Sequence, residues 1–261
     1  MRVAIIGLGF RLGYLGHVFR EMDPDFEIVG YYDPAPAGMA TLTEHGIPAG
    51  IPHESPEALV KAGGFDLLMI GSPNHFHLHH IRLGLEAGVK VFSEKPLVSS
   101  LEDTYALAAL LARYGHENLS VGLVLRYAPL YRDLLAARDA GTLGNIVSVE
   151  AAEHIYPYHG AFFMRDWRRY EKWSGSFMLE KCCHDLDLYN GLIQARPERV
   201  ASFGAGRPLS RRMTRALMGL TTWICSTKSP RAGTGRTRSS IPMAISSTIR
   251  WPSWNTPMAW G

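Results

Sequence analysis

The sequence has few cysteines, no long apolar run and no acidic residue in its last 55 positions. Its three cysteines are odd in number and two of them, Cys182 and Cys183, are adjacent, so they cannot form a disulfide framework. Their spacing does not fit a zinc site either. No apolar stretch approaches the roughly 20 residues that a membrane-spanning helix needs. These absences argue against a disulfide-stapled secreted domain, a zinc module and an integral membrane protein.

The start of the chain and its composition are those of an ordinary globular protein. An apolar run begins within two residues of Met1 and leaves no space for a signal peptide, so we expect a cytoplasmic location. The 261 residues are 46% hydrophobic and 20% charged. This length allows two domains or one large α/β domain with a substantial core.

Charge is divided unevenly between the body of the chain and its C-terminal segment. Residues 1–206 contain all 24 acidic residues and 18 basic ones, for a net charge of −6, whereas residues 207–261 contain nine basic residues, for +9. A basic tail can be a nucleic-acid arm. This one lacks any heptad, zinc or stacking motif, so we expect no nucleic-acid partner.

The first ten residues predict a dinucleotide-binding turn. An apolar run breaks into Gly7-x-Gly9, as a buried parallel strand does where it enters a turn that requires glycine. A helix from about Leu12 to Glu21 would then present its positive end to a pyrophosphate. The residues predicted to contact the cofactor here are Gly7, Gly9, Phe10 and Arg11. The third glycine of the usual fingerprint comes one place late, so an ordinary strand and turn is the alternative.

A second strand, Phe26 to Asp33, ends in an acid at the distance where dinucleotide sites place their ribose-binding carboxylate. A 2′-phosphate about 4 Å from Asp33 would be repelled. No Arg or Lys lies between Asp33 and Lys61 to offset that repulsion, which favours NAD over NADP. The alternative is that Asp33 only opens the turn at Pro34.

Strands and helices then alternate with short links. We predict a helix at Pro56–Ala62, a strand at Phe65–Ile70, a helix from about His77 to Ala87 and a strand at residues 89–93. This alternation predicts an α/β fold in which residues 1–120 form a Rossmann domain with a doubly wound parallel sheet.

Four histidines lie close together at His75, His77, His79 and His80. Such a cluster can bind a metal, but no Cys or carboxylate partner is spaced with it. A loop and helix start that line a polar cleft explain the histidines as well, and we predict no metal site.

Several motifs occur in order along residues 1–205 and together resemble the Gfo/Idh/MocA family, which includes glucose–fructose oxidoreductases and inositol dehydrogenases. They are Gly7-x-Gly9, Asp33, Ser72-Pro-Asn-His-x-His77, Glu86-Ala-Gly88, Val91-Phe-Ser-Glu-Lys-Pro96, Arg126-Tyr-x-Pro129, Gly141-Thr-Leu-Gly144 and Glu180-Lys-Cys-Cys-His-Asp-Leu-Asp187. The resemblance implies that the cofactor pocket also includes Ser72, Pro73, Asn74, His77, Glu94, Lys95 and Pro96. It further implies that the Lys95–Pro96 peptide bond is cis.

The last of these motifs carries the predicted chemistry. Glu180, His184 and Asp187 fall at i, i+4 and i+7, so on a helix they share one face, which on its own is also the pattern of an amphipathic helix with a polar stripe. The resemblance implies that His184 is the acid/base and that Lys95 stabilises the charge that develops on the reacting oxygen. Glu180, where Asp is more usual in the family, completes the catalytic set.

The residues predicted to border the substrate are Lys95, Arg126, Trp167, Arg168, Glu180, His184 and Asp187. For two of them simpler roles are open: Lys95 as a solvated loop cation, and Asp187 as a helix cap or ion-pair partner.

We expect an incomplete α+β domain with an open sheet over residues 121–206. Its predicted strands are Val124–Tyr127 and Ile146–Ala151, with a helix at Pro129–Ala140 between them. The resemblance implies homo-oligomerisation through this sheet, which a shortened sheet would not support.

After about residue 206 the resemblance is expected to stop, and the composition suggests translation in a shifted frame. If each true codon joins the third base of one codon to the first two of the next, Trp223-Ile224 becomes Asp and Trp254-Asn255 becomes Glu. This restores the missing acids and suggests a one-base slip near residues 207–212. As it stands, the segment 207–261 is predicted to hold little regular structure.

The resulting hypothesis is an NAD-dependent oxidoreductase that transfers a hydride between nicotinamide and a hydroxyl or carbonyl carbon of a sugar, cyclitol or related polyol. The alternative is a non-catalytic or truncated, inactive dinucleotide-binding protein.

Overall fold

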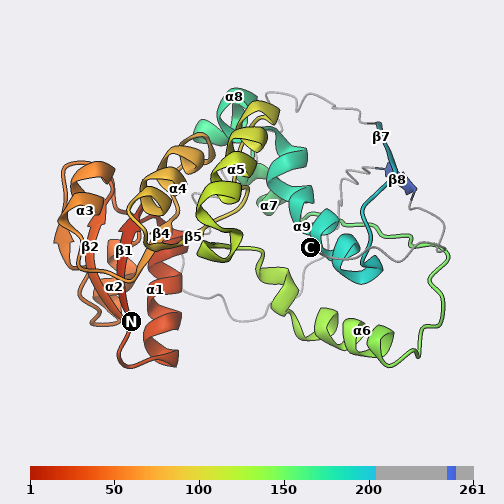
Figure 1. Ribbon diagram of the computed structural model, residues 1–261, viewed down its shortest axis with the longest axis horizontal. Helices are drawn as coiled ribbons and strands as arrows, with labels where there is room; N and C mark the ends of the chain where they lie inside the picture. The colour runs from red at the N-terminus through yellow and green to blue at the C-terminus, as the bar shows by residue number, and fades with distance from the viewer. Residues whose placement is uncertain (204–245, 251–261) are drawn as a thin grey trace, which may run out of the picture. The chain divides into compact units, whose positions relative to one another are not determined.

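The computed structural model describes residues 1–203 and 246–250 (Figure 1). The chain divides into two compact units. The first combines Met1–Ala128 with Trp167–Asp185, and the second combines Pro129–Asp166 with Leu186–Gly261. Within the described residues, no helix is both long and apolar enough to cross a membrane.

A six-stranded parallel sheet forms the centre of the first unit. Its strands are β1 (Arg2–Ile6), β2 (Glu27–Tyr32), β3 (Ile51–Pro52), β4 (Leu67–Ile70), β5 (Lys90–Ser93) and β6 (Leu119–Val121). They lie in the order β3-β2-β1-β4-β5-β6, with every neighbouring pair parallel. The order reverses between β1 and β4, and this reversal is where doubly wound sheets bind ligands. The predicted Rossmann sheet is confirmed.

Helices cover both faces of this sheet (Figure 1). They are α1 (Phe10–Met22) and α2 (Met39–Glu44) on one face, and α3 (Pro56–Ala62), α4 (His77–Glu86) and α5 (Leu101–Tyr114) on the other. Alternate residues of β1 divide between the two faces, because successive strand side chains point in opposite directions. Val3 and Ile5 pack with α1 and α2, whereas Ala4 and Ile6 pack with α3, α4 and α5.

The predicted elements of this unit occur close to their expected bounds. The helix at Pro56–Ala62 is confirmed at both ends, where Ser55 Oγ accepts the Ala58 N–H at 3.0 Å and Pro56 fills the first turn. Helix α1 starts two residues earlier than predicted, because Gly9 is its N-cap. Two short 3-10 helices, η1 (Asn74–Phe76) and η2 (His116–Asn118), follow β4 and α5.

The first unit also contains a later segment of the chain, Trp167–Asp185. This segment contains most of the 3-10 helix η4 (Asp166–Arg169), helix α8 (Glu171–Ser174) and the first half of α9 (Phe177–Ile193). The predicted helix carrying Glu180, His184 and Asp187 is therefore present.

The second unit contains α6 (Pro129–Asp139), α7 (Pro157–Phe162), the end of α9 and the strands β7 (Arg199–Phe203) and β8 (Ser246–Arg250). Helix α6 matches the predicted helix in this region. It holds the end of α9, since the Tyr131 hydroxyl donates to the Leu188 carbonyl at 2.9 Å and Arg138 Nη1 donates to the Leu192 carbonyl at 3.1 Å. A cation among the last carbonyls of a helix also complements the helix dipole.

Two predicted strands are wrong. Val124–Tyr127 is the 3-10 helix η3, and residues 146–151 have no regular structure despite an alternation typical of a strand. A strand needs ladder partners for its backbone N–H and C=O groups, and none of the described strands pairs with either segment.

Most of the C-terminal segment, 207–261, lies outside the described residues. Its residues Ser246–Arg250 form β8, which pairs antiparallel with β7 from Arg199↔Arg250 to Phe203↔Ser246. The expectation of little regular structure does not hold for these five residues.

Candidate active site

The glycine turn after β1 lies against the loop that follows β4. Gly7 has φ +85°, and a Cβ there would lie 2.3 Å from the Ser72 backbone nitrogen, so only glycine fits. Gly9 is different, because a Cβ there would meet no atom within 4 Å. The turn therefore combines a backbone contact at Gly7 with open space at Gly9.

The late third glycine of the fingerprint has a structural explanation. Leu12 stands at the usual glycine position and is buried; a Cβ on Gly71 would lie 2.6 Å from its Cγ. Gly13 takes over close packing, since a Cβ there would lie 2.6 Å from the Gly38 carbonyl oxygen. Two glycines outside the motif thus accommodate its departure from the usual spacing.

This turn fits the pyrophosphate of a dinucleotide. Helix α1 begins at Phe10 with no side-chain hydrogen bond at its N-cap, Gly9, and the space beside Gly9 is open. The first N–H groups of a helix have no partner within the helix, and with the helix dipole they bind anions. Phe10 and Arg11, both exposed, lie in the first turn of α1.

Asp33 directly follows β2, at the carboxyl ends of the parallel strands, where the glycine turn after β1 also lies. Its Oδ1 accepts the Ala35 N–H at 2.7 Å. This contact matches the turn that was the simpler alternative for Asp33. It uses only Oδ1, so it is compatible with a ribose contact through Oδ2.

Glu94 connects the start of α1 to the end of β5. Its Oε1 pairs with Arg11 Nε at 2.7 Å, its Oε2 accepts the Lys95 N–H at 3.3 Å, and only 12% of its side chain is exposed. A Cβ on Gly122 would lie 2.9 Å from Oε2. Arg11 therefore fixes Glu94, and Glu94 fixes the backbone of Lys95.

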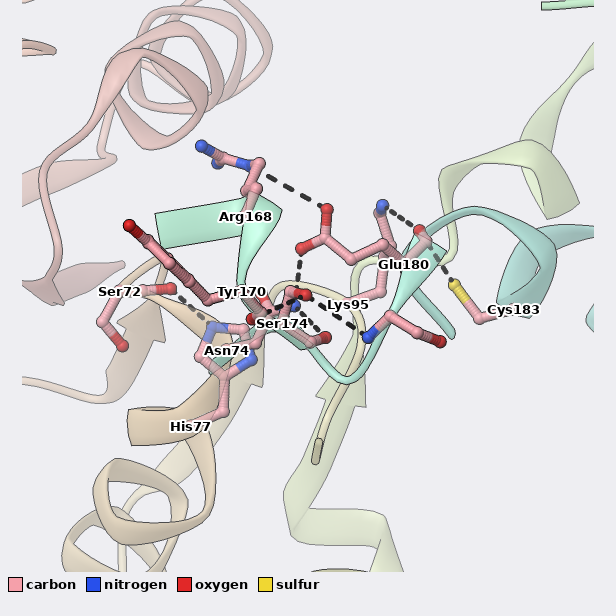
Figure 2. A network of polar contacts seen from close by, with 10 residues as sticks. Ser72, Asn74, His77, Lys95, Arg168, Tyr170, Ser174, Glu180 and Cys183 are labelled. Carbon is pink, nitrogen blue, oxygen red and sulfur yellow. Dashed lines mark hydrogen bonds and ion pairs between the residues drawn. The ribbon is translucent and has the colours of Figure 1, made fainter. Parts of the chain in front are cut away.

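Lys95 reaches the first turns of α9. Its Nζ donates to the Glu180 carbonyl at 2.7 Å, and Cys183 Sγ lies 3.5 Å from the same oxygen (Figure 2). Burial raises the pKa of Cys183, although the nearby Lys95 lowers it, so this thiol is not an activated nucleophile. The Lys95–Pro96 bond is cis, which confirms the prediction.

Buried Asn74 holds the Glu180 side chain. Asn74 Nδ2 donates to the Glu180 Oε1 at 2.5 Å and to the Ser174 carbonyl at 2.9 Å (Figure 2). Arg168 Nε lies 3.9 Å from Glu180 Oε2. Glu180 is only 4% exposed, and its buried carboxylate has a hydrogen-bond donor, Asn74, and a nearby cation, Arg168.

The remaining predicted site residues differ in their surroundings. His184 is buried, one helical turn after Glu180 on α9. Trp167 is half-buried, with the Arg168 guanidinium 4.3 Å from its ring centroid, and Arg126 is exposed in η3. Asp187 lies in the part of α9 that belongs to the second unit, and its role stays a prediction.

The histidines that lie close together in the sequence do not converge on a common partner in the structure. Each of three rings has its own partners: His79 Nε2 lies 2.9 Å from Glu57 Oε1, His80 Nδ1 lies 2.9 Å from Ser72 Oγ, and His77 contacts two backbone carbonyls. Among the described residues, no three or more His, Cys, Asp or Glu side chains are grouped so that they could bind a metal ion.

Burial disfavours the charged form of three of these histidines, His75, His77 and His80. It lowers the pKa of His75 and His77 and, with repulsion from His79 and His77, lowers the pKa of His80 to about 4. For His77, the two backbone carbonyls and the Glu94 carboxylate act in the opposite direction.

Sequence reasoning missed Ser174 and Cys183 as neighbours of the site, whereas Trp173 ends an aromatic and Arg-rich stretch that is expected to border the substrate pocket. The Trp173 ring stacks near His75 at a centroid distance of 5.9 Å. The aromatic and Arg-rich composition of residues 156–173 was a signal for this region, but nothing in the sequence specified these contacts.

Comparisons with known proteins agree with the fold and the motifs. Residues 1–123 match the family described as "Oxidoreductase family, NAD-binding Rossmann fold", and residues 139–234 match "Oxidoreductase family, C-terminal alpha/beta domain". The second match continues past residue 206, where the sequence reading ends the resemblance.

Among curated relatives, scyllo-inositol 2-dehydrogenase (NAD(+)) of Bacillus subtilis is 30% identical over 78% of this chain and 57% of the relative. The 1-carboxy-3-chloro-3,4-dihydroxycyclo hexa-1,5-diene dehydrogenase of Comamonas testosteroni is 27% identical over 78% of the chain and 50% of the relative. The chain thus spans about half the length of these relatives.

A solved structure of Lactobacillus casei scyllo-inositol dehydrogenase, with bound NAD(H) and scyllo-inositol, has a TM-score of 0.66 at 23% identity. The likeness covers 82% of this chain and 62% of the other and supports the fold. The predicted NAD-binding Rossmann domain is confirmed by the first family match. The chain belongs to the Gfo/Idh/MocA family of oxidoreductases.

Proposed function

We propose that this chain derives from an NAD-dependent oxidoreductase that acts on a hydroxyl or carbonyl carbon of a sugar, cyclitol or related polyol. The observation that carries the proposal is the Lys95 ammonium, held 2.7 Å from the Glu180 carbonyl on the helix that also bears His184. The names of two relatives, both dehydrogenases of hydroxylated six-membered rings, support the substrate class.

The bound cofactor supplies a nicotinamide that accepts or gives a hydride. Its pyrophosphate is assigned to the first turn of α1, where Gly9 leaves open space, and its adenine ribose to Asp33. The Asp33 carboxylate also favours NAD over NADP, because a 2′-phosphate beside it would be repelled.

The residues of the first unit would handle the proton and the charge of the substrate oxygen. One N–H of the Lys95 ammonium donates to the Glu180 carbonyl, and an ammonium has two further N–H groups that can meet a substrate oxygen. His184 would take the hydroxyl proton during oxidation and return it during reduction.

Glu180 would fix the geometry of this arrangement. Its carboxylate is held by Asn74 Nδ2 at 2.5 Å, and its own carbonyl accepts from Lys95 at 2.7 Å. The arrangement connects the loop after β4, the loop after β5 and the start of α9. Arg126, Trp167 and Arg168, which belong to the same unit, are proposed to complete the substrate contacts.

The test separates cofactor binding from chemistry. NAD and NADP are titrated into the wild-type chain and into His184→Ala, and hydride transfer with cyclitols and sugars is followed at the NADH absorbance in a frame-restored protein. We expect NAD to bind more tightly than NADP. We expect His184→Ala to lower turnover by about a hundredfold to ten-thousandfold, with NAD affinity unchanged.

Three other outcomes count against parts of the proposal. Equal loss of NAD binding and turnover in His184→Ala points to a structural histidine. Tighter binding of NADP contradicts the role of Asp33. NAD binding without any turnover in the frame-restored protein favours the alternative, a dinucleotide-binding protein without catalysis.

A further inference from the structure

His77 is buried at the start of α4, and both of its ring nitrogens contact backbone carbonyl oxygens. The residue is 1% exposed. Its Nδ1 lies 2.7 Å from the Pro96 oxygen and its Nε2 lies 2.7 Å from the Ser72 oxygen. Figure 2 shows the ring directed at the Ser72 loop. No ring nitrogen is left to contact a cofactor directly.

The two carbonyls belong to loops that leave the sheet at neighbouring strands. The β4–β5 ladder ends at Ile70↔Ser93 and is extended by one bond, from the Glu94 N–H to the Ile70 carbonyl at 2.8 Å. Beyond this point the His77 ring joins the loops. One loop contains Ser72 and Asn74, and the other contains Lys95.

We propose that His77 is a positioning residue that holds the Lys95–Pro96 loop to the Ser72–Asn74 loop, and acts on the site through these two backbones. Each loop has a partner in the same network, because Asn74 binds the Glu180 side chain and Lys95 binds the Glu180 carbonyl. A fixed distance between the loops therefore fixes the ammonium relative to the carboxylate. The loop contacts stand on their own, whereas any effect on turnover rests on the proposed function.

A second histidine of α4 supports the same loop. Ser72 Oγ lies 2.9 Å from His80 Nδ1. When His80 is neutral with its proton on Nε2, its Nδ1 accepts a hydrogen bond from the Ser72 hydroxyl. Ser72 is thus held at its carbonyl by His77 and at its hydroxyl by His80, which makes the Ser72 end of the bridge rigid.

The charged state of His77 decides how many of its contacts are hydrogen bonds. A neutral ring donates from one nitrogen and an imidazolium donates from both. Burial disfavours the imidazolium and lowers the pKa of His77, as His75 also does, whereas the Pro96 and Ser72 carbonyls and the Glu94 carboxylate favour it. His80, on the next turn of α4, is a third titratable neighbour. Only the imidazolium can donate to both carbonyls at once, because a neutral ring has one N–H for two acceptors. The proposal therefore assigns the protonated form to His77.

Two substitutions separate the two contacts. The amide nitrogen of Asn can take the place of histidine Nδ1, and that of Gln the place of Nε2, so His77→Asn keeps the Pro96 contact and His77→Gln keeps the Ser72 contact. The matched control is His79→Gln on the same helix, since His79 is exposed and contacts Glu57. Hydrogen exchange of the full chain is measured by mass spectrometry without cofactor, over peptides covering residues 71–77 and 93–99.

We expect His77→Gln to speed exchange in residues 93–99 and His77→Asn to speed it in residues 71–77, each by about threefold to tenfold, as loss of one hydrogen bond does. His79→Gln should match the wild type in both peptides. Equal acceleration across the whole first unit would show that His77 only packs the core and would overturn the proposal. Unchanged exchange in both variants would overturn it too.

An NAD titration of the same variants keeps this inference separate from the proposed function. If exchange changes as expected but no variant or wild-type chain binds NAD, the bridge stands and the proposed function fails. If NAD binds to every variant with wild-type exchange, the proposed function stands and the bridge fails.

Discussion

Buried His80 is expected to make the stability of the first unit sensitive to acid, because it binds a proton less readily in the folded state than in the unfolded state. Burial lowers its pKa to about 4, below the ordinary histidine value of 6.5. The unfolded chain therefore takes up a proton between pH 6.5 and about 4 that the folded chain does not, and stability is lost as pH falls through this window. Above pH 6.5 both states are neutral and His80 has no effect.

We predict that His80→Asn removes much of this acid sensitivity, because Asn Oδ1 can still accept the Ser72 hydroxyl but does not titrate. Urea unfolding of both proteins at pH 7 and pH 5 measures the change in the free energy of unfolding. The wild type should lose up to about 2 kcal/mol more than the variant between these two pH values. Equal losses would mean that His80 is protonated in the folded protein. Both proteins keep His75 and His77, which makes the comparison specific to His80.

Sequence motifs specified which residues gather at the site but not which atoms meet. The Lys95 and Glu180 pair could be proposed from the family resemblance. Their contact runs from the ammonium to the backbone carbonyl of Glu180, while the carboxylate binds Asn74. Asn74 and Glu180 are 106 positions apart, and only the folded chain determines that they are neighbours.

At the level of secondary structure, the glycines of the first turn have two separable roles. Gly9 has φ −77° and open space at its Cβ position, whereas a Cβ on Gly13 would lie 2.6 Å from the Gly38 oxygen. Gly9 is thus suited to a ligand and Gly13 to close packing of α1 on the loop before α2.

We predict that Gly9→Ala leaves the melting temperature nearly unchanged and weakens NAD binding at least about tenfold, because its methyl group occupies the pyrophosphate space. Gly13→Ala should instead destabilise folding by about 1–3 kcal/mol through overpacking. Thermal unfolding and NAD titration of both variants give the answer. If Gly9→Ala binds NAD as the wild type does, the pyrophosphate does not lie at this turn.

Element prediction succeeded where local pattern and tertiary packing agree. Pro56–Ala62 has a serine cap, a proline in its first turn and a buried Leu59, and both of its ends were predicted correctly. Ile146–Ala151 has the alternation of a strand but no described ladder partner. A strand depends on distant partners in a way that a capped helix does not.

For the whole molecule, cofactor binding and turnover are expected to depend on different parts of the chain. The residues assigned to NAD lie within residues 1–128, and Glu180 and His184 lie within residues 167–185 of the same unit. The net charge changes from −6 over residues 1–206 to +9 over residues 207–261. We proposed a shifted reading frame for this segment, and resequencing codons 205–215 tests that origin directly.

We predict that three chains bind NAD with affinities within about twofold of one another: the 261-residue chain, a chain ending at Gly206 and a frame-restored chain. Only the frame-restored chain should oxidise a cyclitol or sugar, because the restored acidic and apolar residues are expected to complete the sheet of the second unit. Isothermal titration with NAD and an NADH absorbance assay compare the three. A large loss of NAD affinity in the chain ending at Gly206 would show that the C-terminal segment supports the cofactor unit. Full turnover by the 261-residue chain would show that this segment is functional as written and would reject the shifted frame.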